Sequence, residues 1–164
     1  MTETLSGKIA FITGGARGIG RATALKLARA GCDVAIAYFN SHEEAEAVCK
    51  TIRDMGRRAL AVQADVSDPT TVAEAFVEFR KQFDRVDIVV SNAAIGVLKP
   101  AMELTLKHWR RCMETNALAL NTLAQQAVPL MTNGGVLIGL SSLGSLPAEQ
   151  YTAVKVALRD LLSL

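Results

Sequence analysis

The sequence has few cysteines, few aromatic residues and no excess of charge of one sign. Its 164 residues include three cysteines, 5% aromatic residues, and 18 basic against 16 acidic residues, for a formal net charge of +2. Cys32, Cys49 and Cys112 are widely spaced, with neither a C-x-x-C pair nor a histidine cluster beside them, which argues against a disulfide framework and a metal site. The two signs of charge are interleaved without a like-charge block, so no nucleic-acid partner is expected.

Long apolar runs are also missing. No uninterrupted apolar stretch approaches the roughly 18 residues that span a bilayer, and the chain does not open with the charged and apolar regions of a leader. We therefore expect a cytoplasmic protein without a membrane partner. Hydrophobic residues still make up 50% of the sequence. This is enough for a sizeable core, so residues 1–164 are predicted to form a single domain.

Short apolar runs of strand length alternate with segments of helical period. The strands are predicted at Lys8–Thr13, Asp33–Tyr38, Ala59–Ala64, Val86–Ser91 and Gly135–Ser141. The helices are predicted at Ile19–Ala30, Ser41–Met55, Thr70–Phe83 and Thr105–Met131. The strands are nearly continuous runs of Val, Ile, Ala and Leu, which is typical of strands buried on both faces. This pattern predicts an α/β fold, a doubly wound parallel sheet with helices on both faces.

Residues that favour helix ends stand at several predicted boundaries. Ser41 precedes two glutamates and Asp68 precedes Pro69, so both are expected to cap the helices that follow them. Gly31 and Gly56 are expected to close two helices, because glycine readily adopts the left-handed conformation found there.

Four glycines stand directly behind the first predicted strand, in the stretch FITGGARGIG at residues 11–20. In a doubly wound sheet, the first turn from strand to helix is the usual place for a pyrophosphate. Gly14 can take the tight turn, Gly18 lets the backbone approach phosphates, and Gly20 lets the helix pack close to the sheet. The helix N-terminus adds free N–H groups and a partial positive charge. The turn therefore predicts a ligand that contains phosphate.

The spacing Gly14-x-x-x-Gly18-x-Gly20 resembles the cofactor turn of the short-chain dehydrogenase/reductase family. Further motifs similar to those of the family follow in order: Asp65-Val66, Asn92-Ala93-Ala94, Asn116, Ser141-Ser142 and Tyr151-x-x-x-Lys155. The resemblance implies a Rossmann fold that binds a dinucleotide. The cofactor contacts that it implies are Gly14, Arg17, Gly18, Ile19, Gly20, Asp65, Val66, Asn92, Ala93 and Lys155.

The charge at the end of the second predicted strand bears on the choice between NAD and NADP. An acidic residue there would bind the ribose 2′-hydroxyl and repel a 2′-phosphate, but residues 37–41 are Ala-Tyr-Phe-Asn-Ser. Arg17 supplies a guanidinium that can reach a 2′-phosphate, with Asn40 and Ser41 as neutral donors nearby. NADP(H) is therefore the predicted cofactor.

Four catalytic residues follow from the resemblance. Tyr151 would be the general acid in the reducing direction, and Lys155, four residues later on the same predicted helix, would favour its phenolate and hold the nicotinamide ribose. Ser142 would donate a hydrogen bond to the developing oxyanion, and Asn116 would anchor a proton-relay water.

Two features depart from the family pattern. Ser142 lies nine residues before Tyr151, closer than is usual in the family. The chain ends at Leu164, where family members commonly continue, so the C-terminal part of the fold is expected to be missing from this sequence.

Three interpretations of the function remain open. The Tyr151-x-x-x-Lys155 spacing favours a carbonyl reductase resembling the 3-oxoacyl-acyl-carrier-protein reductases of fatty-acid biosynthesis. Residues 92–104, Trp109 and residues 141–145 resemble the short-chain type of bacterial enoyl-acyl-carrier-protein reductase. That type uses a Tyr-x6-Lys couple, although position 158 is a leucine here. The third interpretation is a non-catalytic dinucleotide-binding protein. The resemblance implies a small-molecule or acyl-thioester substrate and a homodimer or homotetramer.

Overall fold

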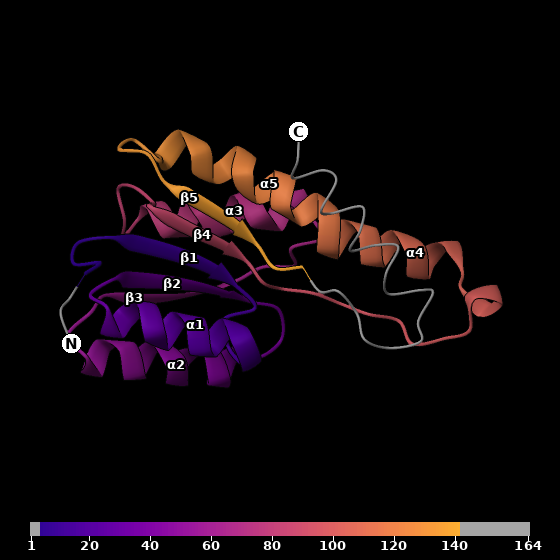
Figure 1. The fold of residues 1–164 in the computed structure, drawn as a ribbon, viewed down its shortest axis with the longest axis horizontal. Coiled ribbons are helices and arrows are strands. Elements are labelled where there is room, and N and C mark those ends of the chain that lie inside the picture. The colour runs from indigo at the N-terminus through magenta and orange to yellow at the C-terminus, as the bar shows by residue number, and fades with distance from the viewer. Residues whose placement is uncertain (1–3, 142–164) are drawn as a thin grey trace.

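The computed structural model describes residues 4–141, which form a parallel five-stranded sheet with flanking helices (Figure 1). The strands are β1 (Ile9–Thr13), β2 (Asp33–Tyr38), β3 (Ala59–Gln63), β4 (Ile88–Ser91) and β5 (Val136–Gly139). Their order in the sheet is β3-β2-β1-β4-β5, and each neighbouring pair is parallel. The order reverses between β1 and β4, and the carboxyl ends at such a switch point are where open α/β sheets bind ligands.

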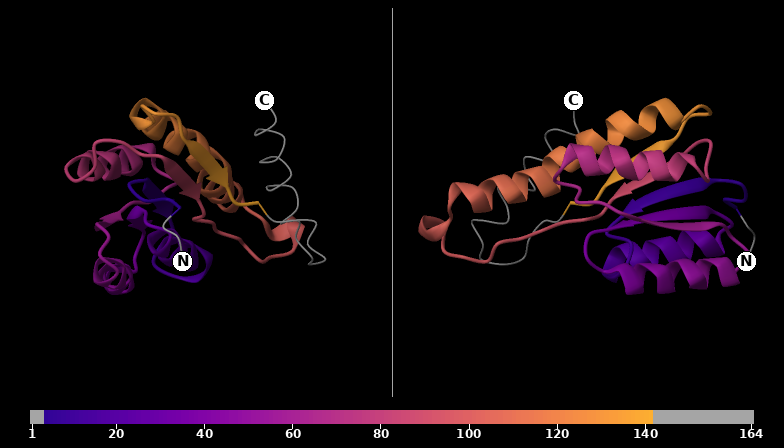
Figure 2. Two further views of the ribbon diagram at one scale, coloured as in Figure 1. Left: turned by 60° about the vertical axis from the view of Figure 1, so that its left-hand side comes forward. Right: turned by 180° about the vertical axis from the view of Figure 1, so that it is seen from behind.

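Helices cover both faces of the sheet. The helices α1 (Gly18–Arg29) and α2 (His42–Asp54) lie against one face, and α3 (Pro69–Arg80) and α5 (Ala119–Ala127) lie against the other (Figures 1 and 2). The predicted doubly wound α/β fold is confirmed.

Each face of the sheet has its own apolar core. Ile12 of β1 belongs to the cluster that α1 and α2 cover, whereas its neighbour Phe11 belongs to the cluster on the α3 side. Phe11 stacks on Phe76 with ring centroids 4.5 Å apart, and Phe79 stacks on Phe83 at 5.0 Å. Successive strand residues point to opposite faces, so the continuous apolar strands reflect burial on both sides of the sheet.

The prediction of one regular helix over Thr105–Met131 is wrong. The segment consists of α4 (Leu106–Met113), a π-helical turn η2 (Glu114–Leu118), α5, and a 3₁₀ turn η3 (Val128–Leu130). Pro129 lies in η3, where its missing N–H prevents a regular α-helical hydrogen bond. Insertions of π-helix often mark functional sites, and η2 carries Asn116.

The predicted helix ends are confirmed in three of four places. Asp68 caps α3 by accepting a hydrogen bond from the Thr70 N–H at 2.8 Å. Gly31 and Gly56 follow α1 and α2 with φ values of 102° and 77°. Ser41 precedes α2 but makes no capping hydrogen bond with its side chain. The backbone of Ser41, with φ −99° and ψ 64°, lies outside the extended region. In that region an N-cap side chain usually accepts a hydrogen bond from an N–H group of the first helical turn.

All three cysteines are free thiols in the structure. Cys32 and Cys49 are buried and Cys112 is half-buried, as expected for small apolar residues. Burial, followed by nearby carboxylates, raises the pKa of Cys32 to about 11 and the pKa of Cys49 to about 12. These two thiols therefore stay protonated and unreactive near neutral pH.

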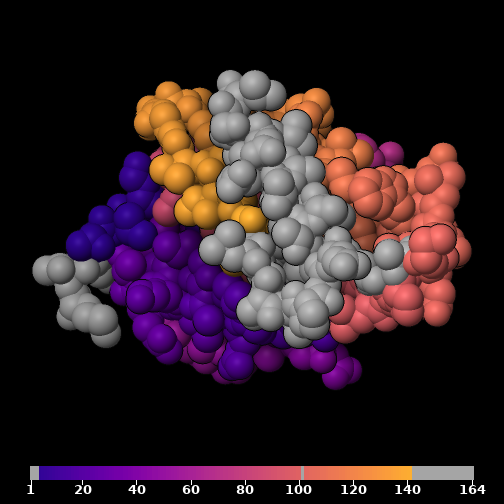
Figure 3. All heavy atoms as spheres, turned by 45° about the vertical axis from the view of Figure 1, so that its right-hand side comes forward, coloured from indigo at the N-terminus to yellow at the C-terminus, as the bar shows by residue number. Residues whose placement is uncertain are grey.

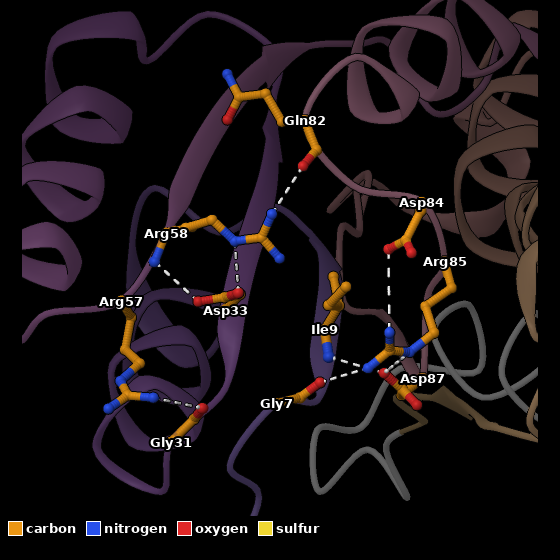
Figure 4. Close-up of polar contacts among 10 residues, drawn as sticks. All are labelled: Gly7, Ile9, Gly31, Asp33, Arg57, Arg58, Gln82, Asp84, Arg85 and Asp87. Atoms are coloured by element: carbon orange, nitrogen blue, oxygen red, sulfur yellow. Dashed lines mark hydrogen bonds and ion pairs between the residues drawn. The ribbon is translucent and has the colours of Figure 1, made fainter.

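Asp87 anchors the amino ends of β1 and β4, at the edge of the sheet opposite their carboxyl ends (Figure 4). Its buried carboxylate accepts hydrogen bonds from the Ile9 N–H and the Lys8 ammonium, both at 3.0 Å, and forms an ion pair with Arg85 at 3.4 Å. Burial would raise the pKa of Asp87, but hydrogen bonds from Lys8 and Ile9 and the charges of Lys8 and Arg85 lower it below its ordinary value. Arg85 also donates to the Gly7 carbonyl at 2.6 Å.

Arg58 makes a second connection at the same edge of the sheet (Figure 4). Its guanidinium donates to the Asp33 carboxylate at 2.7 Å and to the Gln82 carbonyl at 2.9 Å. The same group lies over the Phe83 ring, 4.7 Å from the centroid. Arg58 thereby links the first residue of β2 to the chain that follows α3.

The helix α4 extends beyond the carboxyl ends of the strands (Figure 1), and the segment around it forms one end of the molecule (Figure 3). Leu98, Met102, Leu106 and Trp109 are each at least half exposed. None of the helices within residues 4–141 combines the length and the hydropathy needed to cross a bilayer.

Candidate functional site

A cleft of about 560 Å³ lies at the carboxyl ends of the strands. Its walls are the turn after β1, the end of β2, the residues that follow β3 and β4, and two side chains from the helical segment, Arg111 and Thr115. The cleft is therefore at the switch point of the sheet, and the glycine turn forms part of it.

The glycines of this turn allow a close approach that any side chain would prevent. Gly14 has a φ of 65°, which favours glycine. A Cβ atom at Gly20 would lie 2.3 Å from the Gly14 carbonyl oxygen and 2.6 Å from the side-chain nitrogen of Asn92. A Cβ atom at Gly15 would lie 2.5 Å from the Ile36 side chain. Gly20 thus brings α1 close to the turn itself and to the end of β4.

Gly18 is required for a different reason. A Cβ atom built there meets no described atom within 4 Å, but the φ of 55° strains other residues. Gly18 begins α1, whose first N–H groups have no partner within the helix and whose first turn contains no acidic residue. The preceding residue, Arg17, is exposed and lines the cleft. Positive charge and free donors therefore meet at the start of α1.

Thr13 fixes the turn to the end of β4. Its side chain is buried, and its hydroxyl accepts hydrogen bonds from the N–H groups of Asn92 and Ala93, each at 3.0 Å. The Asn92 amide returns hydrogen bonds to the carbonyls of Thr13 at 2.9 Å and Gly14 at 3.3 Å. The glycine turn and the Asn92-Ala93 motif are thus two halves of one hydrogen-bonded unit.

The end of β2 supplies neutral polar groups to the cleft. Asn40 and Ser41 line it, and the Ser41 hydroxyl is not used in capping α2. The Tyr38 hydroxyl lies 2.7 Å from Nδ1 of His42, so this pair is held at the start of α2. No carboxylate occurs from Tyr38 to Ser41.

Asp65 follows β3 and is held by three hydrogen bonds. One carboxylate oxygen accepts from the Ser67 N–H at 3.0 Å and from the Ser67 hydroxyl at 2.6 Å, and the other accepts from Arg111 at 2.8 Å. Arg111 also contacts the Ser67 hydroxyl. Burial would raise the pKa of Asp65, but the hydrogen bonds from Ser67 and Arg111 and the charge of Arg111 together lower it. The carboxylate is therefore ionised at neutral pH.

Asn116 joins η2 to the loop after β4. Its side-chain oxygen accepts from the Ile95 N–H at 2.9 Å, and its side-chain nitrogen donates to the Ile95 carbonyl at 2.8 Å. Asn116 also lines a second, small cavity of about 10 Å³ together with Ser91 and Leu120. A cavity of this size is at the lower limit for one water molecule.

The cleft brings together eight of the predicted cofactor residues: Gly14, Arg17, Asn40, Ser41, Asp65, Val66, Asn92 and Ala93. Gly18, Ile19 and Gly20 lie in the first turn of α1, and the Ile19 side chain is 65% exposed. The predicted residues Ser142, Tyr151 and Lys155 lie outside the described residues. Within residues 4–141, no three His, Cys, Asp or Glu side chains form a group that could hold a metal ion.

Four further residues shape the cleft without having been singled out from the sequence: Thr13, Phe39, Arg111 and Thr115. Thr13 directly precedes Gly14 in the glycine motif, and this position could have predicted that its side chain lies beside the turn. Arg111 contacts Asp65 although the two residues are 46 positions apart in the sequence. No local sequence pattern indicates such a contact.

The fold and the cleft define a doubly wound α/β protein of the dinucleotide-binding class. The family model for short chain dehydrogenases matches residues 8–163. The chain therefore belongs to the short-chain dehydrogenase/reductase family.

Two relatives illustrate the extent of the similarity in sequence. A hydroxynaphthalene reductase of Aspergillus fumigatus is 40% identical over 141 residues, which make up 86% of this chain and 52% of that protein. An uncharacterized oxidoreductase of Methylorubrum extorquens is 36% identical over 138 residues, 84% of this chain and 56% of that protein. The chain spans about half the length of the curated relatives it matches.

Solved structures match the fold closely. A blue fluorescent protein from a metagenomic library, crystallised in complex with NADPH, has a TM-score of 0.90 and 38% identity, and the match covers 96% of this chain and 67% of that one. A short chain dehydrogenase from Burkholderia cenocepacia in complex with NADP has a TM-score of 0.89 and 37% identity, with 98% and 71% of the two chains covered.

Proposed function

We propose that this protein is an NADP(H)-dependent oxidoreductase that reduces a carbonyl group. The observation that carries the proposal is the charge of the cleft at the end of β2. Arg17, Asn40 and Ser41 all line it, whereas no carboxylate occurs in that segment to repel a 2′-phosphate. The complexes of two related structures with NADPH and NADP support the same choice.

The residues present fit a dinucleotide. The cleft, of about 560 Å³, lies in the size range of small-molecule sites. At Gly18, next to Arg17, no described atom lies within 4 Å of the Cβ position, so the backbone there is open to a ligand. The N-terminus of α1 would hold the pyrophosphate and Arg17 the 2′-phosphate. Bound NADPH supplies the hydride.

The remaining chemistry is assigned to side chains of this chain. Tyr151 would donate the proton to the substrate oxygen, Lys155 would lower the pKa of that tyrosine, and Ser142 would stabilise negative charge on the oxygen. Asn116 would act by holding the loop at Ile95 and by polarising a water in the adjoining small cavity.

For the substrate, we infer an open-chain 3-oxoacyl thioester as the first candidate. The Tyr151-x-x-x-Lys155 spacing favours it over an enoyl thioester. The similarity to a hydroxynaphthalene reductase favours a second candidate, a hydroxynaphthalene, whose keto tautomer carries the carbonyl group.

The test is NADPH oxidation with these three substrates offered separately, for the wild type and for Tyr151→Phe. We expect turnover of a ketone, and its loss in the variant with unchanged affinity for NADPH. Tight binding of NADPH without turnover of any substrate would instead favour the non-catalytic interpretation.

The choice of cofactor is tested with Arg17→Gln. We expect the dissociation constant for NADPH to rise about tenfold, because a charged hydrogen bond is lost, while that for NADH stays unchanged. The matched control is Arg21→Gln, an exposed arginine in the first turn of α1 that does not line the cleft. An equal loss of NADPH and NADH affinity in Arg17→Gln would contradict the proposed contact with the 2′-phosphate.

We also propose that the protein assembles as a homodimer or homotetramer. The exposed side chains of Leu106 and Trp109 on α4 support this proposal, because such apolar surface is commonly covered by a partner. Light scattering coupled to size-exclusion chromatography measures the state directly, and a monomeric mass would contradict it.

A further inference from the structure

Exposed cations gather on the helix that follows the glycine turn. Arg17, Arg21, Lys26 and Arg29 are all exposed, and α1 contains no acidic residue. None of the four forms an ion pair or a side-chain hydrogen bond with any of residues 4–141. We call these four residues the α1 basic surface.

The lack of pairing sets α1 apart from the elements around it. In α2, Lys50 forms an ion pair with Asp54 at 2.9 Å, and Arg53 forms one with Glu46 at 3.3 Å. Between residues 4 and 98, every lysine and arginine outside the α1 basic surface has a polar partner, with the exception of Arg80. The cations of α1 are therefore not part of an ion-pair network that supports the fold, and their charge can act on a ligand.

Two glutamates lie beside the α1 basic surface. The helices α1 and α2 lie side by side on one face of the sheet (Figure 1). Glu43 and Glu44, in the first turn of α2, are exposed and form no ion pair within the described part of the chain. They closely follow Ser41, which lines the cleft. Against these two carboxylates, Arg17 alone would leave one net negative charge, and the other three cations of α1 change this to two net positive charges.

The α1 basic surface begins at the cleft, because Arg17 lines it. From the rise of a helix, Arg21, Lys26 and Arg29 lie about 5, 12 and 17 Å along α1 from its first residue. The Debye length is about 30 Å at an ionic strength of 0.01 M and about 8 Å at 0.15 M. At low ionic strength, all four cations therefore act together on an anion that approaches the cleft.

We propose that Arg21, Lys26 and Arg29 steer an anionic dinucleotide into the cleft, and so raise its rate constant of association without contacting it once it is bound. The proposal rests on the proposed function, since it takes the ligand to be NADPH. The 2′-phosphate of NADPH adds about two negative charges to those of the pyrophosphate. Charge of one sign beside a cleft raises association rates by roughly tenfold or more.

The experiment measures association and dissociation of NADPH separately, by stopped-flow fluorescence at ionic strengths of about 0.01, 0.15 and 1 M. The variant combines Lys26→Gln with Arg29→Gln, two residues outside the cleft. The matched control combines Arg80→Gln with Lys81→Gln. It removes the same number of charges at the end of α3, on the opposite face of the sheet (Figure 2). Arg21 is kept in both, because it serves as the control for Arg17.

The Lys26→Gln, Arg29→Gln variant should bind NADPH more slowly. From Coulomb's law in water with ionic screening, we expect the rate constant of association to fall about fivefold at 0.01 M, less than about twofold at 0.15 M and not measurably at 1 M. The rate constant of dissociation should stay unchanged, because neither side chain contacts the bound cofactor. NADH lacks the 2′-phosphate, so its association should slow by less. The control at α3 should lose at most about twofold at 0.01 M.

Removal of negative charge beside the cleft should have the opposite effect. With Glu43→Gln combined with Glu44→Gln, we expect association at 0.01 M to become about fivefold faster, because two repelling carboxylates are lost. The gain should vanish at 1 M. These changes keep every side chain that lines the cleft, and unchanged melting temperatures verify that each variant is folded.

Three results would overturn the proposal. Equal losses in the α1 variant and the α3 control would mean that only the net charge of the molecule matters. Faster dissociation at an unchanged rate of association would indicate a direct contact in place of steering. A wild-type rate of association that does not depend on ionic strength would exclude long-range attraction altogether.

The outcomes also distinguish this inference from the proposed function. If no carbonyl substrate is reduced but NADPH association follows the expected pattern, the proposed reaction fails and the steering role stands. If a ketone is reduced with NADPH but the α1 variant associates like the wild type at 0.01 M, the steering role fails and the proposed function stands. If the wild type binds neither NADPH nor NADH, both proposals are overturned.

Discussion

Replacing Asp87 by asparagine tests how the amino ends of β1 and β4 are held together. The carboxylate is 4% exposed and bonds the Ile9 N–H and the Lys8 ammonium, with Arg85 as a third partner. An amide of the same size keeps an oxygen toward the Ile9 N–H and Arg85, but it loses the negative charge and turns its NH₂ group toward the Lys8 ammonium. The substitution makes the charged hydrogen bond from the Ile9 N–H neutral and removes the ion pairs with Lys8 and Arg85, both of which are partly exposed. We therefore expect the free energy of unfolding to fall by about 2 kcal/mol.

The pH dependence of this loss has a definite sign. The pKa of Asp87 is lowered in the folded state, so its contribution is complete above the unfolded-state pKa of about 4 and is lost as the pH falls through the folded-state value. The difference between wild type and Asp87→Asn should therefore be constant from about pH 7 to pH 5 and shrink at lower pH.

The assay is urea unfolding followed by circular dichroism at several pH values. Asp84→Asn is the matched control, because Asp84 faces the same arginine at 4.0 Å but is 83% exposed, and it should cost at most about 0.5 kcal/mol. For a chain of this size, 2 kcal/mol corresponds to a lower melting temperature by about 4–8 °C. An equal cost in both variants, or a cost at Asp87 that does not change down to pH 3, would refute the argument.

Four further substitutions have expected outcomes. Gly20→Ala places a Cβ atom 2.3 Å from the Gly14 carbonyl oxygen. It should lower the free energy of unfolding by about 2–3 kcal/mol, measured as a lower melting temperature without cofactor. It should also weaken NADPH binding, measured as a smaller rise in melting temperature when NADPH is added. Asn116→Leu removes both hydrogen bonds to the loop after β4. It should cost about 2 kcal/mol, measured by urea unfolding, and a cost near zero would contradict the bonding seen. Asp68→Ala should lower the free energy of unfolding by about 1 kcal/mol, because the cap of α3 is lost. Ser41→Ala should lower it by less, because the Ser41 side chain makes no capping hydrogen bond. Urea unfolding measures both.

Local patterns in the sequence were sufficient for the fold. Strands buried on both faces need apolar residues at every position, and the runs around Phe11 and Val34 have them. The glycine turn is also a local signal, because a tight turn and a close helix require glycine at fixed positions. These features depend on residues near one another in the chain, and for that reason the sequence alone predicted them.

Other parts of the site depend on contacts that the sequence does not display. The ion pair between Asp65 and Arg111 joins residues 46 positions apart, and Arg111 also lies over the ring of Phe39, which follows β2. The π-helical turn around Asn116 was missed because its residues have ordinary helical spacing. Ser41 has the residue type of a cap, but its backbone conformation decides otherwise.

The hydroxyl of Thr13, bonded to two N–H groups at the end of β4, has a consequence for the thermodynamics of binding. The floor of the cleft acquires its shape when β1 and β4 pair, so the loss of backbone entropy there belongs to folding. A ligand then meets a surface that is already ordered, and more of its contact energy remains as affinity. For the same reason the N–H groups of Asn92 and Ala93 should exchange with solvent only when the central strands separate.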